Sequence, residues 1–169
     1  TDDCQGSVVS TSDVRPSVSE IEAALGFFQG EVEQVPPAFS AIKTGGRRAY
    51  AIARSGQMPK LMSRRVRIDR LQLVSWDDTD HATFEMVCGK GTYVRALARD
   101  LSVWLGTVGH VRALHRHRTG PFDENQAISL DSLEALGHSS ARSQCLLPVE
   151  AALADIPAVP VTSPEADRL

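Results

Sequence analysis

The chain has 169 residues, of which 42% are hydrophobic and 23% charged, and its formal net charge is −3. This composition is enough for the core of one domain, or most of one, and it excludes a disordered chain. The acidic N-terminus lacks a signal-peptide core, no apolar run approaches the roughly 18 residues of a membrane helix, and three scattered cysteines fit neither a disulfide framework nor a zinc site. We therefore expect a cytoplasmic protein with no membrane partner.

A first helix is predicted close to the N-terminus. Ser17 and Glu20 form the Ser-x-x-Glu pattern of a capping box, and apolar residues recur after them at helical spacing. We expect this helix to begin near Val18 and to end at Gly30.

The segment Gln34-Val35-Pro36-Pro37 is predicted to be extended, because two adjacent prolines exclude a regular helix or a central strand. After Gly45-Gly46, a short helix is expected at roughly Ala49–Arg54, ending at Gly56. This helix carries Tyr50 in its first turn. From the pattern alone, Tyr50 is better explained as a core residue than as a functional one.

A strand with a bend is predicted next. Val66 and Ile68 alternate with polar residues, whereas Leu71 and Leu73 alternate in the opposite phase. The change of phase predicts a bulge near Asp69-Arg70.

A polar turn over residues 77–80 leads into a second predicted strand, Ala82–Cys88, which shows alternating hydrophobicity. A helix follows and ends at Gly106. Its apolar face is formed by Val94, Leu97, Ala98, Leu101 and Leu105.

The remaining third of the chain contains weaker signals. Alternation over residues 111–116 predicts a strand that is broken by Gly120-Pro121. A short capped helix is expected from Leu130 to Leu136, followed by a loop over residues 137–143. Prolines then mark a linker or the first strand of a further domain; they are Pro157, Pro160 and Pro164.

The turn between the second strand and its helix reads Gly89-Lys90-Gly91-Thr92-Tyr93-Val94-Arg95. Its glycines let a ligand approach the backbone, and the first amides of the helix are potential donors to an anion such as phosphate. A strand, a glycine-containing turn and a helix are also common where no ligand binds, and Tyr93 would then simply pack on the sheet. A P-loop is excluded, because Phe84 and Gly91 stand where that motif needs a glycine and a Ser or Thr.

Charge is distributed unevenly along the chain. Residues 43–118 hold 15 of the 18 Lys and Arg but only 6 of the 21 Asp and Glu, which gives this stretch a formal charge of +9 and the remainder −12. One explanation of this excess of positive charge is that these side chains simply lie on solvent-exposed surfaces without a ligand. The alternative is a groove for a polyanion, and cations interspersed with aromatic rings suit RNA, with its negative backbone and unstacked bases.

Three blocks of sequence carry a resemblance to a known family. They are Gln-Val-Pro-Pro-Ala-Phe-Ser-Ala-Ile-Lys at 34–43 with Gly-Arg-Arg-Ala-Tyr at 46–50, Gly-Lys-Gly-Thr-Tyr-Val-Arg at 89–95, and Leu-His-Arg at 114–116 with Gly-Pro-Phe at 120–122. In order and spacing these blocks resemble the TruB family of bacterial tRNA pseudouridine-55 synthases, across roughly residues 1–155.

The resemblance implies an α+β fold of the pseudouridine synthase type, with a mixed, mostly antiparallel sheet flanked by helices and RNA lying across a basic cleft. It also implies a reaction without cofactor, in which the T-loop uridine of tRNA is flipped out, cleaved from its ribose, rotated and rejoined through carbon. We expect residues 1–155 to be the middle and C-terminal part of the catalytic domain. Residues 156–169 are expected to be a linker or the start of a truncated C-terminal RNA-binding domain.

Site residues are also implied by the resemblance. Tyr50 would stack on the flipped base and help remove its proton, and Arg95 would pair with the catalytic carboxylate. Tyr93 and Leu114 would line the base pocket. The residues expected to bind RNA through their charge are Lys43, Arg47, Lys90 and Arg116.

The sequence departs from the family in several respects, one of which is Arg65, where a proline is common after Arg64. The nucleophilic aspartate of the family lies in a Gly-x-Leu-Asp motif, which does not occur in these 169 residues, and Asp2 and Asp3 lie in a different context. His115 stands where an arginine is common, which places a pH-dependent charge there. We therefore expect this chain to be a fragment that is inactive on its own.

Two hypotheses of different class remain. The chain is a piece of a genuine pseudouridine synthase, or it is an RNA-binding module without catalysis. A metal enzyme is disfavoured and no metal is expected, because His110, His115 and His117 have no acidic partner at ligand spacing in the sequence.

Overall fold

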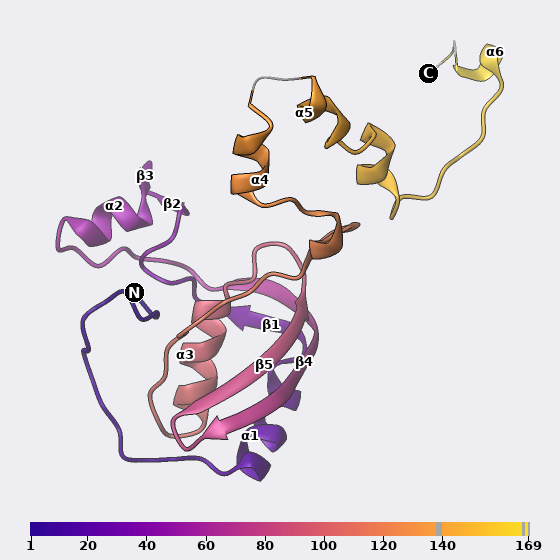
Figure 1. The fold of residues 1–169 in the computed structure, drawn as a ribbon. Coiled ribbons are helices and arrows are strands. Elements are labelled where there is room, and N and C mark those ends of the chain that lie inside the picture. The colour runs from indigo at the N-terminus through magenta and orange to yellow at the C-terminus, as the bar shows by residue number, and fades with distance from the viewer. Residues whose placement is uncertain (138–139, 167, 169) are drawn as a thin grey trace. The chain divides into compact units, whose positions relative to one another are not determined.

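The computed structural model describes residues 1–137, 140–166 and 168, and the chain divides into two units, Thr1–Ala113 and Leu114–Leu169. Both units combine short helices with antiparallel strands, as Figure 1 shows. Within the described residues, no helix is both long enough and apolar enough to cross a bilayer.

The first unit is built on a three-stranded antiparallel sheet in the order β1-β4-β5. Its strands are β1 (Gly30–Gln34), β4 (Arg64–Asp78) and β5 (His81–Cys88), with the long, bent β4 in the centre. The register between β4 and β5 shifts between Ile68 and Arg70, which confirms the predicted bulge. The bulge turns both halves of β4 toward one core, since an extra residue restores the phase of the apolar side chains.

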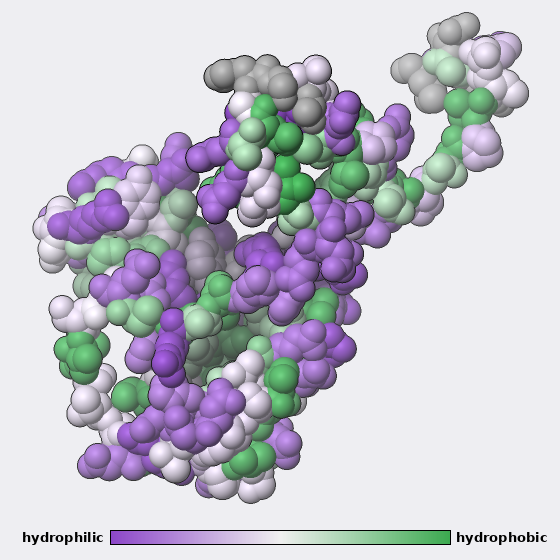
Figure 2. Space-filling model, in the orientation of Figure 1, coloured by the Kyte–Doolittle hydropathy of each residue, from purple (hydrophilic) through white to green (hydrophobic). Residues whose placement is uncertain are grey.

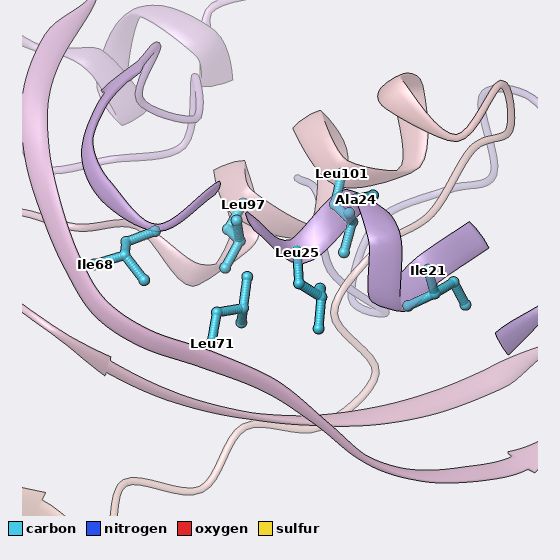
Figure 3. Close-up of a cluster of buried hydrophobic side chains, with 7 residues drawn as sticks. All are labelled: Ile21, Ala24, Leu25, Ile68, Leu71, Leu97 and Leu101. Carbon is cyan, nitrogen blue, oxygen red and sulfur yellow. The ribbon is translucent and has the colours of Figure 1, made fainter. Parts of the chain in front are cut away.

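Two helices pack against the sheet and enclose the core. Helix α1 (Val18–Leu25) and helix α3 (Val94–Trp104) contribute buried side chains that meet those of β4 (Figure 3). The core cluster consists of Ile21, Ala24, Leu25, Ile68, Leu71, Leu97 and Leu101. These are positions that the helical and strand periodicities predicted.

The capping box at the start of α1 is confirmed, with both reciprocal hydrogen bonds between Ser17 and Glu20 present. The predicted end of this helix at Gly30 is wrong. The α-helix ends at Leu25, a 3₁₀ turn η1 (Gly26–Phe28) follows, and Gly30, with a φ of 83°, begins β1 instead. The left-handed conformation at Gly30 turns the chain into the sheet.

A small hairpin and a helix follow the proline-rich segment. Strands β2 (Lys43–Thr44) and β3 (Arg47–Arg48) pair across Gly45 and Gly46, whose φ angles are 56° and 78°. Two consecutive positive φ angles define a type I′ turn, which glycine adopts without strain. Helix α2 (Ala49–Arg54) begins directly after β3, within the predicted bounds.

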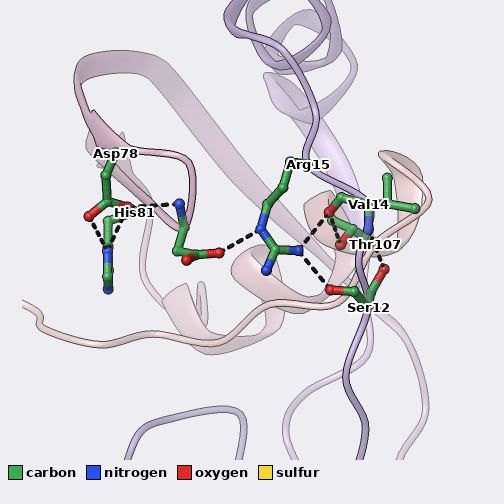
Figure 4. A network of polar contacts seen from close by, with 7 residues as sticks. Ser12, Val14, Arg15, Asp78, His81 and Thr107 are labelled. Carbon is green, nitrogen blue, oxygen red and sulfur yellow. Dashed lines mark hydrogen bonds and ion pairs between the residues drawn. The ribbon is translucent and has the colours of Figure 1, made fainter.

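Polar contacts hold the N-terminal segment over residues 12–15 against the rest of the first unit (Figure 4). The Arg15 side chain bonds the Asp80 carboxylate at 2.5 Å and the Ser12 carbonyl at 2.7 Å, while the Thr107 hydroxyl donates to the Val14 carbonyl. These contacts tie the segment to the β4–β5 turn and to the end of α3. Their side chains are largely exposed, so each pair contributes little stability alone.

The second unit contains only short elements. Strands β6 (Arg118–Thr119) and β7 (Phe122–Asp123) form a hairpin, and η2 (Glu124–Gln126) follows. Helix α4 (Leu130–Ala135) is capped by Ser129 as its sequence predicted. The last elements are α5 (Ala141–Gln144), η3 (Val149–Leu153) and α6 (Ser163–Ala166).

Two predictions about the C-terminal third are wrong. No strand forms over residues 111–116, where Val111 makes only an isolated bridge to Asp3. Alternation alone does not create a strand, because the backbone also needs a partner for its hydrogen bonds. The loop expected over 137–143 falls partly on residues 138–139, outside the described residues, and its last part lies within α5.

Candidate functional site

Arg95, in the first turn of α3, is the most constrained of the predicted site residues. Its guanidinium donates to the carbonyl of Thr1 at 2.9 Å, to the carbonyl of Phe39 at 2.9 Å and to the Asp3 carboxylate at 3.3 Å. The Arg95 side chain is 26% exposed and that of Asp3 23%. A half-buried arginine with this many acceptors has a defined orientation.

Asp3 was assigned no role in the sequence analysis, yet it is the carboxylate that faces Arg95. A hydrogen bond from the Thr1 side chain, a second from the Gln5 amide and the charge of Arg95 together lower the pKa of Asp3, against the opposing effect of partial burial. The carboxylate is therefore held in its ionised form. No sequence signal relates residues 92 positions apart, so only the fold reveals this pair.

A second arginine repeats this arrangement one helical turn later. Arg99 donates to the Val35 carbonyl at 2.7 Å and lies 3.5 Å from the Asp2 carboxylate. Residues four apart share a helix face, so Arg95 and Arg99 both join the N-terminal residues and the segment over residues 35–39 to α3. The i, i+4 spacing of the two arginines was the available signal for Arg99.

The start of α3 is held by a buried amide side chain. Gln34 is 3% exposed, and its Oε1 accepts a hydrogen bond of 2.8 Å from the backbone N–H of Tyr93. This places Tyr93, which is half-buried, directly before the helix that carries Arg95. The Tyr93 amide, which directly precedes the helix, is thus not available to an anion, and the prediction that the first amides of the helix donate to one stays a prediction.

Tyr50 lies on the surface rather than in the core. Its residue is 39% exposed, and the Arg54 guanidinium lies 5.4 Å from the centroid of its ring. Its backbone N–H donates to the carbonyl of Ser40, the neighbour of the Phe39 that accepts from Arg95. Adjacent carbonyls of one short segment therefore anchor α2 and the Arg95 side chain, and the explanation of Tyr50 as a core residue is wrong.

The predicted phosphate-binding side chains of the first unit are all exposed. Lys90 lies in the turn before α3, where Gly91 has a φ of 86°, and Lys43 and Arg47 lie on the β2–β3 hairpin. Within residues 1–137, 140–166 and 168, none of the three forms an ion pair. Unlike Arg48, whose guanidinium donates to the Ala41 carbonyl, they remain available to an external anion.

Leu114 and Arg116 belong to the second unit, so the structure does not join them to the residues above. Both are exposed, with Leu114 at 61%, and they lie in the irregular segment before β6. The sequence placed them in a predicted strand over residues 111–116, and this local geometry is wrong.

Beside Arg116, the second unit gathers two histidines and a glutamate. The His115 Nε2 lies 2.8 Å from Glu124 Oε2, the His117 Nδ1 lies 3.2 Å from Glu124 Oε1, and the two imidazole centroids are 4.5 Å apart. These contacts lower the pKa of Glu124, that from His115 most and that from His117 next. The expectation that these histidines have no acidic partner is therefore wrong.

A groove lies elsewhere in the first unit. It has a volume of about 430 Å³ and is lined mainly by η1, β1 and α3, including Phe27, Phe28, Val32, Leu97 and Trp104. None of the site residues predicted from the sequence lines it.

Comparisons with known proteins show that this chain is similar to pseudouridine synthases. Residues 1–94 match the sequence model described as "TruB family pseudouridylate synthase (N terminal domain)", and residues 95–154 match the "tRNA pseudouridylate synthase B C-terminal domain". Similar proteins include the tRNA pseudouridine synthases B of Rhodospirillum rubrum, 55% identical over 100% of this chain, and of Caulobacter vibrioides, 53% identical over 99%. The chain belongs to the TruB family, as its sequence motifs predicted.

These matches cover only part of the length of each relative. The chain spans about half the length of the curated relatives it matches, covering 55% of the Rhodospirillum protein and 54% of the Caulobacter protein. A solved structure titled "Crystal Structure of a Cbf5-Nop10-Gar1 Complex" aligns with 85% of this chain and 40% of its own, at a TM-score of 0.61 and 23% identity. At this identity the likeness concerns the fold, and it confirms the predicted α+β class.

Proposed function

We propose that the protein to which these residues belong converts the T-loop uridine 55 of tRNA to pseudouridine. The observation that supports this most is the orientation of Arg95, which is held by two carbonyls and a carboxylate at the start of α3 in a chain of the TruB family. A reaction on tRNA would take place in the cytoplasm, and it would need no cofactor.

In this proposal, Arg95 keeps the catalytic carboxylate ionised and oriented. The uridine must leave the base stack before its glycosidic bond is accessible. Tyr50, exposed on α2, stacks on the flipped base, while Tyr93 and Leu114 line the base pocket. The cations proposed to contact RNA phosphates are Lys43, Arg47, Lys90 and Arg116.

Residues 1–169 do not contain a Gly-x-Leu-Asp motif, so we expect them to lack turnover when tested alone. Asp3 faces Arg95, but we assign it to positioning that arginine rather than to attack on the base. The test is tritium release from a T-arm stem-loop labelled at carbon five of its uridines. Turnover by the pure 169-residue chain above a no-protein blank would contradict the expected inactivity, and Asp3→Asn would then identify whether Asp3 is the nucleophile.

A second candidate function is RNA binding without catalysis, which Lys43, Arg47 and Lys90 support because they are exposed and form no ion pair with any described residue. Either candidate predicts weak, strongly salt-dependent binding of a T-arm stem-loop. Each neutralised phosphate contributes about −0.7 to −0.9 to the slope of log affinity against log salt concentration. Replacing Arg47 or Lys90 with Ala should therefore flatten the slope by about one unit. The matched control is Arg15→Ala, because Arg15 is already paired with Asp80.

Tyr50 provides a contrasting variant. Tyr50→Ala should reduce affinity by about 1–3 kcal/mol, the usual contribution of a stacked base, and leave the salt slope unchanged. Tyr50→Phe retains the ring and should bind like the wild type. A flattened slope in Tyr50→Ala, or an affinity equal to wild type, would contradict the stacking role. If no variant alters binding, residues 1–169 do not form a competent RNA site on their own.

A further inference from the structure

We propose that His115, His117 and Glu124 form a binding site for one divalent transition-metal ion of the kind that imidazole prefers, such as Zn²⁺ or Ni²⁺. The site lies entirely within the second unit and does not rest on the proposed catalytic function. It contradicts the expectation, drawn from the sequence, that the protein has no metal site.

The β6–β7 hairpin brings the three residues together. Its register pairs Arg118 with Asp123, so the residue before β6 and the residue after β7 are also opposite each other. The backbone N–H of Glu124 donates to the carbonyl of His117 at 3.0 Å, which extends the pairing by one step. His115 lies two residues before His117, and its imidazole approaches the same carboxylate. A sequence separation of seven to nine residues thus becomes direct contact.

The distances suit a metal ion with little rearrangement. One potential ligand atom from each residue lies within 4.8 Å of the others, and the two contacts between imidazole and carboxylate measure 2.8 and 3.2 Å. Ligand atoms bound to one zinc ion at about 2.0–2.2 Å in tetrahedral geometry are separated by about 3.3–3.6 Å. Side-chain rotations that shift the ligand atoms by about one ångström or less therefore bring the three atoms around an ion. The side chains are 52–68% exposed, so such rotations meet no packing resistance.

The type of ligand selects the class of metal. Two imidazoles with one carboxylate favour zinc, nickel, copper or ferrous iron, whereas magnesium and calcium favour sites made of oxygen ligands. Three protein ligands leave at least one coordination position for water, as in open zinc sites. The Glu124 carboxylate supplies negative charge that offsets part of the ion's positive charge. Arg116 and Arg118, in the same segment, are positively charged, so the carboxylate is the group there that favours a cation.

The test is isothermal titration of the untagged 169-residue chain with ZnCl₂ and with NiCl₂, together with the visible absorption of bound Co²⁺. We expect saturable binding of one ion per chain. Loss of a supporting partner alone typically costs about 10–100-fold in metal affinity, so His117→Ala and Glu124→Gln should each raise the Kd at least about tenfold. Glu124→Gln retains the shape of the side chain and a hydrogen bond to imidazole, so the hairpin stays intact in this variant. It therefore tests the metal site even where His117→Ala loosens the hairpin.

The matched control is His81→Asn. His81 also contacts a carboxylate, that of Asp78 at 2.9 Å, but without a second histidine among the described residues of that site. This variant should bind metal like the wild type. The proposal is overturned if the wild-type chain shows no saturable binding, if Glu124→Gln binds as tightly as the wild type, or if His81→Asn weakens binding as much as His117→Ala.

Discussion

The two units of the chain are stabilised in different ways. In Thr1–Ala113, seven buried side chains from α1, β4 and α3 form one cluster, whereas in the described part of Leu114–Leu169 no residue is buried. Figure 2 shows hydrophobic residues on the surface of the molecule. In the second unit, the exposed hydrophobic side chains include Leu130, Leu146, Val149, Ile156 and Val159. Helices of four to six residues are marginal without packing, so local caps and turns dominate the second unit.

This difference separates the proposed site residues into two groups. Arg95 and Tyr93 lie at the start of the core helix α3, where side-chain hydrogen bonds orient them. Leu114 and Arg116 lie on a unit that has no comparable core. We infer that the orientation of Arg95 and Tyr93 depends on the core of the first unit.

The largest expected effect comes from the core. Ile68→Ala should lower the free energy of unfolding by about 2–5 kcal/mol, because Ile68 on β4 is fully buried in the core cluster that β4 forms with α1 and α3. The comparison variant is Leu133→Ala on α4, where Leu133 is 36% exposed, and it should stay within about 0.5 kcal/mol. Urea unfolding followed by circular dichroism measures both. A large effect of Leu133→Ala would reveal a core in the second unit and break the comparison.

A smaller effect is expected from the buried amide at the start of α3. Gln34→Ala should cost about 1–3 kcal/mol, since it leaves the Tyr93 N–H buried without an acceptor. Gln29→Ala is the control, because the Gln29 side chain is exposed and accepts only a long hydrogen bond of 3.4 Å from the Leu71 amide. If the two variants unfold at the same urea concentration, the hydrogen bond from Tyr93 does not hold the helix.

The N-terminal caps offer a matched pair across the two units. Ser17 caps α1 and Ser129 caps α4, each accepting a hydrogen bond from a backbone amide three residues on. Ser17→Ala should lower the unfolding free energy of the first unit by about 1 kcal/mol. Ser129→Ala should leave that transition unchanged and instead speed hydrogen exchange of the α4 amides. Equal shifts of the main transition would mean that both units unfold together.

The smallest expected effect is a pH dependence of the same capping box. The Ser17 amide and hydroxyl donate to Glu20 and lower its pKa below the ordinary value of 4.5. A carboxylate with a lowered folded pKa stabilises the fold above its ordinary pKa, and this contribution is lost as the pH falls through the folded value. The stability difference between wild type and Glu20→Gln should therefore shrink as the pH falls below the ordinary pKa of 4.5. Glu22→Gln, outside the capping box, should show no comparable trend.

The elements that the sequence predicted well depend on neighbours within a few residues. The capping box of α1, the length of α2 and the apolar face of α3 arise from hydrogen bonds and side-chain spacing inside one element. The bulge near Asp69-Arg70 was also predictable, because it leaves a phase change in the strand itself. The family motifs likewise are short local segments, and they identified the TruB family correctly.

What the sequence did not predict depends on partners far along the chain. Strand β1 contains two glutamates and lacks a strong strand pattern, but its backbone pairs with β4, where Glu31 and Glu33 lie opposite Arg67 and Arg65. Residues 111–116 show the reverse case, since they alternate like a strand but pair with no strand among the described residues, apart from the isolated bridge of Val111 to Asp3.

The same distinction holds for the site. The motif in the sequence proposed Arg95, Tyr93 and Lys90 as site residues, but tertiary structure alone joined Arg95 to Asp3 and to Phe39, 92 and 56 residues away. It also joined Glu124 to His115 and His117 through a hairpin whose strands are two residues long. Sequence by itself determines which groups are available and which local structure carries them. Which groups meet is decided by the packing of the whole chain, because a contact between distant residues leaves no periodic signal in either segment.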